Sequence, residues 1–308
     1  MKILITGGNG FLGKHVTPKL QLLNYKVWAP NSKELNVLDR DCLSDKFNKY
    51  KPDIILHMAA LCGGILANKN SPADFLRDNT QMALNIYEVA RENNIKYIYS
   101  LGSVCAYPKY CPTPFKEDNI WNGAAEETNF PYGQAKRTLL MLGQTYREQY
   151  GFKGAHLIPV NLYGEHDHFD LVNSHVIPAL INKFTTAVRN NDPYVECWGS
   201  GGATREFLYA GDAADAISEA VLTGFDSDLP INLGTGKEIY IKELAELIKE
   251  LTGYTGEIVF NGTVSDGQPK RMLDVSRAKE LLNWTANTSL KEGVLKTITW
   301  YRDSLVGA

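Results

Sequence analysis

Disulfide patterns, membrane-spanning segments and an excess of charge of one sign are all missing from this sequence of 308 residues. Its five cysteines are odd in number and scattered, without a Cys-x-x-Cys motif, which argues against a disulfide framework or zinc site and fits a reducing compartment. No apolar run approaches the ~20 residues that a transmembrane helix requires. The net charge of −3 gives no attraction to nucleic acid or to an anionic membrane. We therefore expect a cytoplasmic protein that binds neither.

Internal repeats, low-complexity segments and a signal peptide are also missing. The first residues enter a strand pattern at once, and Gly7 and Gly8 interrupt it too early for the apolar core of a signal peptide. Apolar residues make up 44% of the chain and charged residues 22%, which is ordinary for a globular protein. The length allows one large α/β domain, or a large domain with a smaller one.

A glycine-rich loop stands between the first predicted strand, residues 2–6, and the first predicted helix, residues 11–23. It satisfies both Gly-x-Gly-x-x-Gly and Gly-x-x-Gly-x-x-Gly, patterns that permit a tight turn and close approach of the backbone to a pyrophosphate at a helix N-terminus. The alternative is a glycine-rich turn without a ligand, but the strand before it and the helix after it favour a dinucleotide site. The predicted cofactor-binding residues here are Gly7, Gly8, Asn9, Gly10, Phe11, Leu12 and Gly13.

The choice of cofactor depends on the residues after the second predicted strand, which spans residues 25–28. An NAD site places an acidic residue about 20 residues past the glycines. No carboxylate occurs there before Glu34. Ser32 and Lys33 stand at this place and could meet a 2′-phosphate, although such a pair in a loop is often only solvated. We predict NADP, used as NADPH, with NAD as the alternative.

Strands and helices alternate through the first half of the chain. Further strands are predicted at residues 53–57, 97–101 and 155–161, and long helices at 74–93 and 132–150. This alternation predicts an α/β fold with a Rossmann-type doubly wound parallel sheet. After about residue 165 shorter elements follow, which indicate a smaller, discontinuous α/β substrate-binding lobe. The predicted domains are residues 1–165 with segments about 205–235 for the cofactor, and about 166–204 with 236–308 for the substrate.

Tyr132 and Lys136 stand four apart in the predicted helix 132–150 and therefore share one face. A lysine ammonium beside a phenol favours the phenolate, so we expect Lys136 to lower the pKa of Tyr132 and improve it as a proton donor and acceptor. Ser103 follows the strand 97–101, at the edge of the sheet where ligands bind, and can hydrogen-bond a substrate oxygen. Tyr-x-x-x-Lys alone is more often a solvated helix face, so this context is what indicates hydride chemistry on a carbonyl.

His166, His168 and His175 are the histidines that stand closest together in the sequence. Histidines near one another can ligate a metal ion, but no carboxylate–histidine spacing here matches a known site. We therefore predict no metal.

The glycine loop, Ser103, Tyr132 and Lys136 occur in the order of the extended short-chain dehydrogenase/reductase superfamily, which the chain resembles. A narrower resemblance, over essentially the whole chain, is to the GDP-L-fucose synthase family of GDP-4-keto-6-deoxy-mannose 3,5-epimerase/4-reductases. The segments that carry it are residues 62–65, 67–68, 72–75, 102–109, 161–164, 173–180, 198–201 and 205–207. The Ser-His-Val-Ile-Pro sequence within 173–180 is far more specific than the glycine loop.

The resemblance implies roles for individual residues. Tyr132 would be the acid at the C4 oxygen, Lys136 would hold the nicotinamide ribose, and Ser103 would hydrogen-bond the C4 oxygen. Cys105 and His175 would handle the protons of epimerisation, for which groups of intermediate pKa are suited. Further cofactor contacts would come from Asp39, Ala59, Leu101, Gly102, Lys136, Pro159, Asn161, Leu162 and His175. The GDP-sugar would be held by Lys183, Trp198, Arg205 and Asp266.

Purely structural interpretations stay open for four of these residues. Cys105 could be a buried apolar residue, His175 a helix-cap neighbour, Trp198 a core residue, and Arg205 the ion-pair partner of Glu206. Two other positions depart from the family's pattern. Asn9 and Ser32 stand where the family usually has arginines that hold the 2′-phosphate.

Three functions are compatible with this sequence. The first is the bifunctional epimerase and reductase, which Cys105 and His175 favour. The second is a related sugar-nucleotide reductase or epimerase acting on another GDP-4-keto-sugar. The third is a non-catalytic, dinucleotide-binding regulatory protein, against which Ser103, Tyr132 and Lys136 speak. The resemblance also implies a homodimer formed by the helices 74–93 and 132–150, although helices packed on the sheet would have the same pattern.

Overall fold

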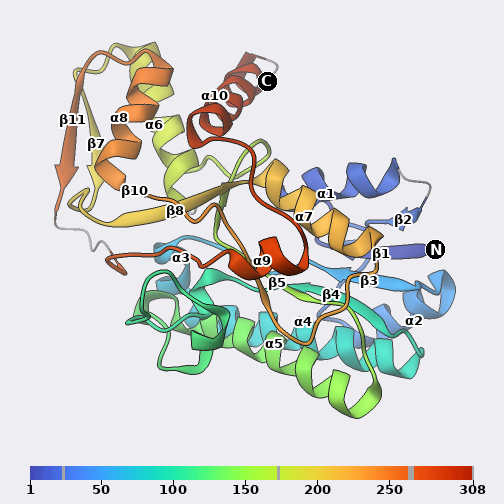
Figure 1. The fold of residues 1–308 in the computed structure, drawn as a ribbon. Helices are drawn as coiled ribbons and strands as arrows, with labels where there is room; N and C mark the ends of the chain where they lie inside the picture. The colour runs from blue at the N-terminus through green and yellow to red at the C-terminus, as the bar shows by residue number, and fades with distance from the viewer. Residues whose placement is uncertain (23–24, 172–173, 263–266, 307–308) are drawn as a thin grey trace.

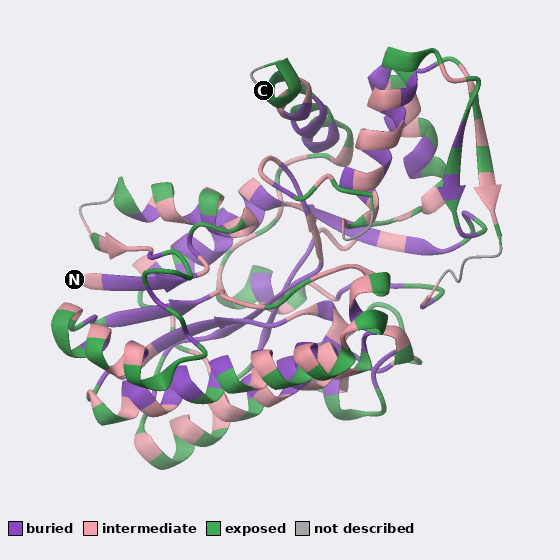
Figure 2. Ribbon diagram, turned by 180° about the vertical axis from the view of Figure 1, so that it is seen from behind, coloured by how far each residue is buried: buried purple, intermediate pink, exposed green. Residues whose placement is uncertain are grey.

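A computed structural model of the protein describes residues 1–22, 25–171, 174–262 and 267–306. The chain forms a larger lobe around a central sheet and a smaller lobe to one side of it (Figure 1). Strands buried on both faces lie at the centre of the larger lobe, and the helices around them expose their outer sides (Figure 2). The α/β fold expected from the sequence is therefore confirmed.

The central sheet of the larger lobe has six parallel strands in the described part of the chain, in the order β2-β1-β3-β4-β5-β9. Their bounds are Lys26–Trp28 for β2, Lys2–Thr6 for β1, Ile54–His57 for β3, Tyr97–Leu101 for β4, His156–Pro159 for β5 and Ile231–Leu233 for β9. The strand order reverses direction at β1, between β2 and β3. Open parallel sheets bind ligands beyond the carboxyl ends of their strands at such a switch point.

Helices cover both faces of this sheet, as a doubly wound fold requires. On one face lie α1 (Phe11–Gln21), α7 (Ala210–Leu222) and α9 (Ser276–Leu281), and on the other α2 (Arg40–Tyr50), α4 (Pro72–Glu92) and α5 (Phe130–Tyr150). Alternate side chains of a strand point to opposite faces. Accordingly, Ile3 and Ile5 join the core under α1 and α7, whereas Leu4 joins the core under α2 and α4.

The smaller lobe has its own sheets and its own core. One sheet joins β10 (Glu238–Tyr240), β8 (Thr204–Tyr209) and β6 (Asn161–Tyr163), and a parallel pair joins β11 (Glu257–Asn261) to β7 (Tyr194–Trp198). Three helices pack there: α6 (Val176–Asn190), α8 (Ile241–Thr252) and α10 (Leu290–Val306). Sheet membership alone does not set domain boundaries, so the predicted division of the chain stays a prediction.

Some elements differ from those expected. A short helix α3 (Ile65–Asn70), which is not among the helices predicted from the sequence, begins directly after Gly64. The polar connection 107–131 holds two 3-10 turns, η2 (Glu117–Trp121) and η3 (Glu127–Asn129), and another such turn, η1 (Val104–Ala106), follows β4. Among the described residues, no helix is both long and apolar enough to cross a membrane.

Two buried histidines stabilise the central sheet through neighbouring hydroxyl groups. His57 Nδ1 shares a hydrogen bond of 2.8 Å with Thr6 Oγ1, and His156 Nδ1 shares one of 2.8 Å with Ser100 Oγ. Burial lowers the pKa of each ring from 6.5 to about 3, with a smaller contribution from the positive charge of Lys136. Both rings are therefore neutral in the folded protein at neutral pH.

This burial predicts a loss of stability in acid. Below pH 6.5 the unfolded chain binds protons that the folded histidines cannot accept, so the free energy of unfolding should fall with pH until about pH 3. Each histidine contributes a slope of about 1.4 kcal/mol per pH unit. Urea unfolding between pH 7 and pH 5 measures this slope. It should be smaller for His57→Asn than for the wild type and unchanged for the exposed-residue control His168→Asn; equal slopes in all three would contradict the assignment.

Candidate active site

The glycine loop lies at the switch point and leaves no room for side chains. Gly7 has a φ of +73°, a conformation that favours glycine, and a Cβ there would lie 2.8 Å from the amide nitrogen of Ala59 after β3. A Cβ on Gly13 would lie 2.2 Å from the carbonyl oxygen of Gly7. Gly10 precedes α1 and has no side chain to cap the helix N-terminus. This cradle fits the pyrophosphate of a dinucleotide, which would lie against the first turn of α1, formed by Phe11 and Leu12.

The residues expected at the adenosine end lie around the end of β2. Asn9 Nδ2 donates to the carbonyl of Ala29 at 2.7 Å and so ties the glycine loop to that strand. Ser32 and Lys33 are exposed in the next turn. Asp39 caps α2 by accepting the amide of Cys42 at 3.0 Å, so a structural role accounts for it and its cofactor role stays a prediction.

The structure brings Tyr132 and Ser103 together, with Cys62 as a third partner. The Tyr132 hydroxyl lies 3.2 Å from Cys62 Sγ, and either atom can donate in this hydrogen bond. The side chain of Ser103 lies close enough to the same phenol to act on its pKa, which it lowers against the larger effect of burial. The ring of Phe75 packs edge-on against Tyr132 at 6.2 Å between centroids. These residues come from the segments that follow β3 and β4 and from the first turns of α4 and α5.

Lys136 lies on the same face of α5 as Tyr132, as the spacing predicts, but it contacts the ring and not the hydroxyl. Its Nζ is 5.7 Å from the ring centroid and donates to the carbonyl of Leu101 at 2.9 Å. Burial lowers the pKa of Lys136. The pKa of Tyr132 is raised well above its ordinary value, first by burial and then by the negative charges of Cys62 and Cys105. The expected lowering of the tyrosine pKa by Lys136 is therefore wrong for this geometry.

Cys105 lies in the turn η1 directly after Ser103, and its own amide donates to Ser103 Oγ at 3.2 Å. Its sulfur accepts hydrogen bonds from Asn129 Nδ2 at 3.4 Å and from Arg271 Nη1 at 3.7 Å. Arg271 is buried and its guanidinium also donates to Gln268 at 3.2 Å. Cys105 is only half-buried and has polar partners, unlike an inert core cysteine.

His175 occupies the N-cap position of α6, but its side chain makes no capping hydrogen bond. Its residue surface is exposed, and surrounding protein still desolvates the ring enough to lower its pKa, with a smaller contribution from His168. No hydrogen bond between the described atoms joins His175 to Cys105. Their partnership in proton transfer therefore stays a prediction.

Five other predicted cofactor residues lie at the carboxyl ends of β4 and β5 or in the residues that follow them. Leu101 ends β4 and Gly102 follows it, where a Cβ would lie 2.5 Å from His156 Nε2. Pro159 ends β5. Asn161 donates from Nδ2 to the carbonyl of Glu206 at 2.9 Å, and Leu162 packs half-buried beside it. All of them therefore lie at the carboxyl edge of the central sheet, and their roles in cofactor binding stay predictions.

Lys183 and Trp198, both predicted to hold the GDP-sugar, lie side by side in the smaller lobe. Lys183 Nζ is 4.9 Å from the centroid of the Trp198 ring and donates to the carbonyl of Glu196 at 2.8 Å. Trp198 is 50% exposed, so the interpretation of this residue as a core side chain is wrong. An exposed indole with a cation on one face can offer a stacking surface to a base.

Arg205 is half-buried and donates to the carbonyl of Thr204 at 2.7 Å, and Gly267 lies near its guanidinium. It forms no ion pair with Glu206, which was the alternative considered for it. Glu206 points the other way, fully buried, and accepts the amides of Gly236 and Leu273 at 2.7 Å each. Asp266, the fourth predicted GDP-sugar residue, lies outside the described residues.

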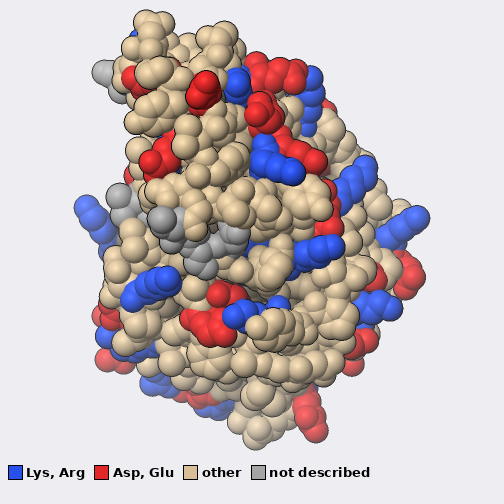
Figure 3. All heavy atoms as spheres, turned by 90° about the vertical axis from the view of Figure 1, so that its left-hand side faces the viewer, with Lys and Arg blue, Asp and Glu red and all other residues tan. Residues whose placement is uncertain are grey.

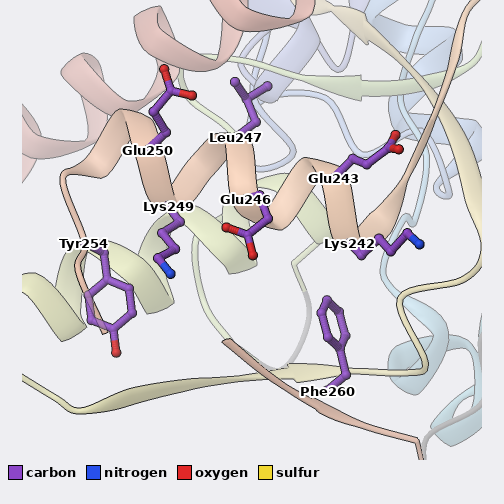
Figure 4. A pocket seen from close by; sticks show the side chains of 8 residues that line it. All are labelled: Lys242, Glu243, Glu246, Leu247, Lys249, Glu250, Tyr254 and Phe260. Carbon is purple, nitrogen blue, oxygen red and sulfur yellow. The ribbon is translucent and has the colours of Figure 1, made fainter. Parts of the chain in front are cut away.

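One hollow of the smaller lobe lies apart from the predicted site residues. A hollow of about 670 Å³ between α8 and β11 is lined by residues such as Lys249, Tyr254 and Phe260, and none of the predicted site residues is among them (Figure 4). Figure 3 shows the side toward which the parallel strands run, with basic and acidic side chains intermingled there. The described residues contain no group of three or more potential metal ligands.

Sequence reasoning missed three residues of this site, namely Cys62, Asn129 and Arg271. Cys62 was noted only as part of a segment that resembles the family. It could have been identified because it follows β3 closely, three residues after Ala59, which lies against the glycine loop. Asn129 directly precedes α5. Arg271 comes from far along the chain, and it reaches the site because residues 269–271 run beside β8. There the amide of Glu206 donates to the carbonyl of Arg271 at 3.1 Å. No sequence spacing reveals that contact.

The fold and this cluster define a nicotinamide-dependent oxidoreductase site, and the sequence agrees. Residues 3–234 match the model of the NAD dependent epimerase/dehydratase family, and the chain belongs to that family. It is therefore an enzyme that uses a nicotinamide dinucleotide.

Full-length relatives narrow this class. The chain is 38% identical over 302 residues to the GDP-L-colitose synthase of Yersinia pseudotuberculosis, covering 98% of both chains. It is 36% identical over 312 residues to the GDP-L-fucose synthase of Escherichia coli (strain K12), covering 98% of this chain and 97% of the relative. A crystal structure of a GDP-L-fucose synthetase from Naegleria fowleri bound to NADP superimposes with a TM-score of 0.88 at 30% identity, covering 100% of this chain and 95% of the other. The resemblance to the GDP-L-fucose synthase family is confirmed.

The tight cradle predicts that Gly7→Ala weakens cofactor binding. A Cβ at φ +73° would collide with the backbone of Ala59 and push the loop out of the position that binds the pyrophosphate. Restoring that position on binding costs about 1–3 kcal/mol, which corresponds to roughly 5- to 150-fold weaker binding. Fluorescence titration with NADPH measures the change. Gly262→Ala is the matched control, because its Cβ would meet nothing within 4 Å. Equal affinity in the Gly7 variant and the control would contradict the cradle assignment.

Proposed function

We propose that this enzyme is an NADPH-dependent GDP-L-fucose synthase, which epimerises GDP-4-keto-6-deoxy-D-mannose at C3 and C5 and then reduces C4 to give GDP-L-fucose. The observation that carries the proposal is the position of Tyr132, Ser103 and Cys105 within one cluster beside the glycine cradle. A reductase alone needs the first two residues, whereas the thiol next to them suits proton transfer at a carbon adjacent to the ketone.

The chain binds the cofactor through the glycine cradle and the ends of β4 and β5. The nicotinamide, when bound, would supply the hydride for C4. NADP is preferred in this proposal because Ser32 and Lys33 lie exposed where a 2′-phosphate would reach, and the N. fowleri relative was solved with NADP. Lys136 would hold the nicotinamide ribose from its buried place beside Leu101.

Reduction needs a proton donor at the C4 oxygen, and Tyr132 supplies it. Because burial raises the pKa of Tyr132, the phenol stays protonated at neutral pH and is ready to give its proton as the oxygen gains negative charge. Ser103 donates a second hydrogen bond to the same oxygen. Those two donors also stabilise the enolate that forms during epimerisation.

Epimerisation begins with the ketone, which makes the protons at C3 and C5 acidic. Inversion requires that one group remove a proton from one face of the ring and that another return a proton to the opposite face. Cys105 takes the first role and His175 the second, since thiols and imidazoles exchange protons near neutral pH. Burial lowers the pKa of His175, so its imidazolium form gives up a proton more readily than that of a fully hydrated histidine.

The GDP portion of the substrate would lie in the smaller lobe. Lys183 and Arg205 provide positive charge for the diphosphate, and Trp198 provides an exposed ring for the guanine. Asp266 is included among the residues that hold the GDP-sugar only because of the sequence resemblance to the family.

A second candidate is formation of GDP-L-colitose, because the Yersinia relative of that name is 38% identical over nearly the whole chain. The same cluster would serve both reactions, and the substrate would differ. A non-catalytic regulatory role is disfavoured by family membership and by the intact Ser103, Tyr132 and Lys136.

We also propose a homodimer. The apolar side chains of Leu76 and Leu84 on α4 and of Met141 on α5 are exposed in the single chain, on helices that pack against each other. Sedimentation equilibrium would show a mass twice that of the chain, and a monomer would contradict this. The expected place of the enzyme in the cytoplasm stays a prediction.

Product analysis tests the function directly. The purified enzyme, incubated with GDP-4-keto-6-deoxy-D-mannose and either NADPH or NADH, should yield GDP-L-fucose by NMR, faster with NADPH. A product that is reduced at C4 but unchanged at C3 and C5 would show that the enzyme is a reductase without epimerase activity. Turnover only with the keto-sugar precursor of GDP-L-colitose would favour the second candidate.

Separate variants should divide the two half-reactions. Tyr132→Phe should lower the reduction rate by roughly 10²–10⁴-fold, because the proton donor is lost while cofactor contacts remain. Cys105→Ser and His175→Asn should each block deuterium uptake at C3 or C5 from D₂O, measured by mass spectrometry and NMR. His168→Asn is the matched control. Undiminished exchange in both Cys105 and His175 variants would show that the pair does not carry the epimerisation.

A further inference from the structure

Arg271 is a buried cation that lies against the sulfur of Cys105. It is only 8% exposed, and its Nη1 donates to Cys105 Sγ at 3.7 Å. Its Nε donates to buried Gln268 at 3.2 Å, and Gln268 is fixed in turn to the carbonyl of Lys109 at 2.8 Å. The carbonyl of Arg271 accepts the amide of Glu206 at 3.1 Å. The guanidinium is therefore held in place before any substrate binds.

The charge of Arg271 has no acidic partner in the part of the chain that the structure describes. The side-chain partners of Arg271 there are Gln268 and Cys105, and neither is a carboxylate. A buried cation without a counter-charge is costly, and ionisation of the neighbouring thiol would supply one. Thiols beside an arginine ionise more readily than isolated thiols do.

A second donor reaches the same sulfur from the start of α5. Asn129 occupies the N-cap position of that helix, but its side chain makes no capping hydrogen bond, and Nδ2 donates to Cys105 Sγ at 3.4 Å instead. Asn129 is only 8% exposed, and its Oδ1 is buried without a hydrogen-bond partner among the described atoms. A neutral thiol is a weak acceptor, whereas hydrogen bonds to an ionised acceptor are stronger. Two buried N–H donors on one sulfur therefore suit a thiolate.

We propose that Arg271 and Asn129 are positioning residues that form a clamp and hold Cys105 as a thiolate, the form that can remove a proton from the sugar. As the S–H bond forms, the electron pair of the broken C–H bond enters the enolate, whose negative charge lies on the C4 oxygen beside Tyr132 and Ser103. Half-buried Cys105 later gives this proton to solvent water, and Arg271 regains its counter-charge. This inference rests on the proposed function, in which Cys105 is the base of epimerisation.

Two titratable groups of α5 interact electrostatically with the same sulfur. Burial raises the pKa of Tyr132, and the negative charges of Cys62 and Cys105 raise it further. Burial lowers the pKa of Lys136, and the same two negative charges oppose this effect. Lys136 Nζ lies over the Tyr132 ring, however, whereas Arg271 donates to the sulfur itself. Arg271 is therefore the cation whose removal should affect the thiolate most.

Alkylation of Cys105 by iodoacetamide tests the clamp without substrate, because the thiolate is the form that reacts. The tryptic peptide 97–109 contains no other cysteine, so mass spectrometry follows this residue alone. In Arg271→Gln the pH midpoint of the alkylation rate should rise by about one unit, and the rate at pH 7 should fall roughly tenfold. Arg271→Lys keeps the charge and should restore most of the rate. Asn129→Ala should shift the midpoint in the same direction by less.

Controls separate the clamp from packing. Arg189→Gln, at an exposed arginine of α6, is the matched control and should leave the midpoint unchanged. NADPH binding shows that each variant is folded, and Asn129→Ala decides the question if Arg271→Gln does not fold. An unchanged midpoint in the folded variants would overturn the proposal. Equal behaviour of Arg271→Lys and Arg271→Gln would also overturn it, because only packing would then have been lost.

Deuterium uptake from D₂O separates this inference from the proposed function. With GDP-4-keto-6-deoxy-D-mannose, uptake at C3 or C5 should fall roughly tenfold in Arg271→Gln at pH 7 and recover at higher pH, with KM unchanged. A raised KM with an unchanged alkylation profile would show that Arg271 binds substrate and would overturn the clamp. Absence of uptake in the wild type, together with an alkylation profile that depends on Arg271, would support the clamp and overturn the proposed epimerisation.

Discussion

The close approach of helix α5 to the turn after β4 is the constraint on which this site depends. A Cβ on Gly133, the residue after Tyr132, would lie 2.4 Å from the carbonyl oxygen of Cys105. Two buried cations of α5 hold the same approach: Lys136 donates to the carbonyl of Leu101 at 2.9 Å and Arg137 Nε to that of Ala106 at 2.6 Å. The helix carrying the phenol is therefore fixed to the strand end that presents Ser103 and Cys105. Any larger residue at position 133 would separate the acid from the groups it works with.

The sheet topology places this pair of elements beside the cofactor cradle. Parallel strands end at one edge, and the reversal of strand order at β1 leaves a crevice there. Gly7 after β1 and Ala59 after β3 touch across that crevice, and Cys62, three residues farther on, reaches Tyr132. The smaller lobe then adds Arg271, whose segment runs along β8 and brings a buried cation to the sulfur of Cys105. The site is thus assembled from five separate parts of the sequence: the segments after β1, β3 and β4, the start of α5, and the segment that holds Arg271.

Much of this could be predicted from the sequence, for identifiable reasons. The glycine loop, the alternating strands and helices, and the Tyr132–Lys136 spacing are local patterns, and local geometry fixes what they become. The orientation of Lys136 could not be predicted, because the carbonyl that it binds belongs to β4 and is distant in sequence. Likewise, Arg205 and Glu206 are adjacent and opposite in charge, yet alternation along β8 sends them to opposite faces, and backbone amides satisfy the buried carboxylate. Contacts of this kind depend on how the lobes pack against each other, and the spacing of residues in the sequence does not determine that packing.

The central claim is that one pocket brings a phenol, a thiol and an imidazole to a single keto-sugar. A crystal structure of the Tyr132→Phe protein with NADP and GDP-4-keto-6-deoxy-D-mannose tests it most directly. The account predicts the C4 oxygen within hydrogen-bond distance of Ser103, with Cys105 and His175 on opposite faces of the sugar ring. A sugar bound with either side chain turned away from C3 and C5, or lying in the hollow beside α8, would contradict it.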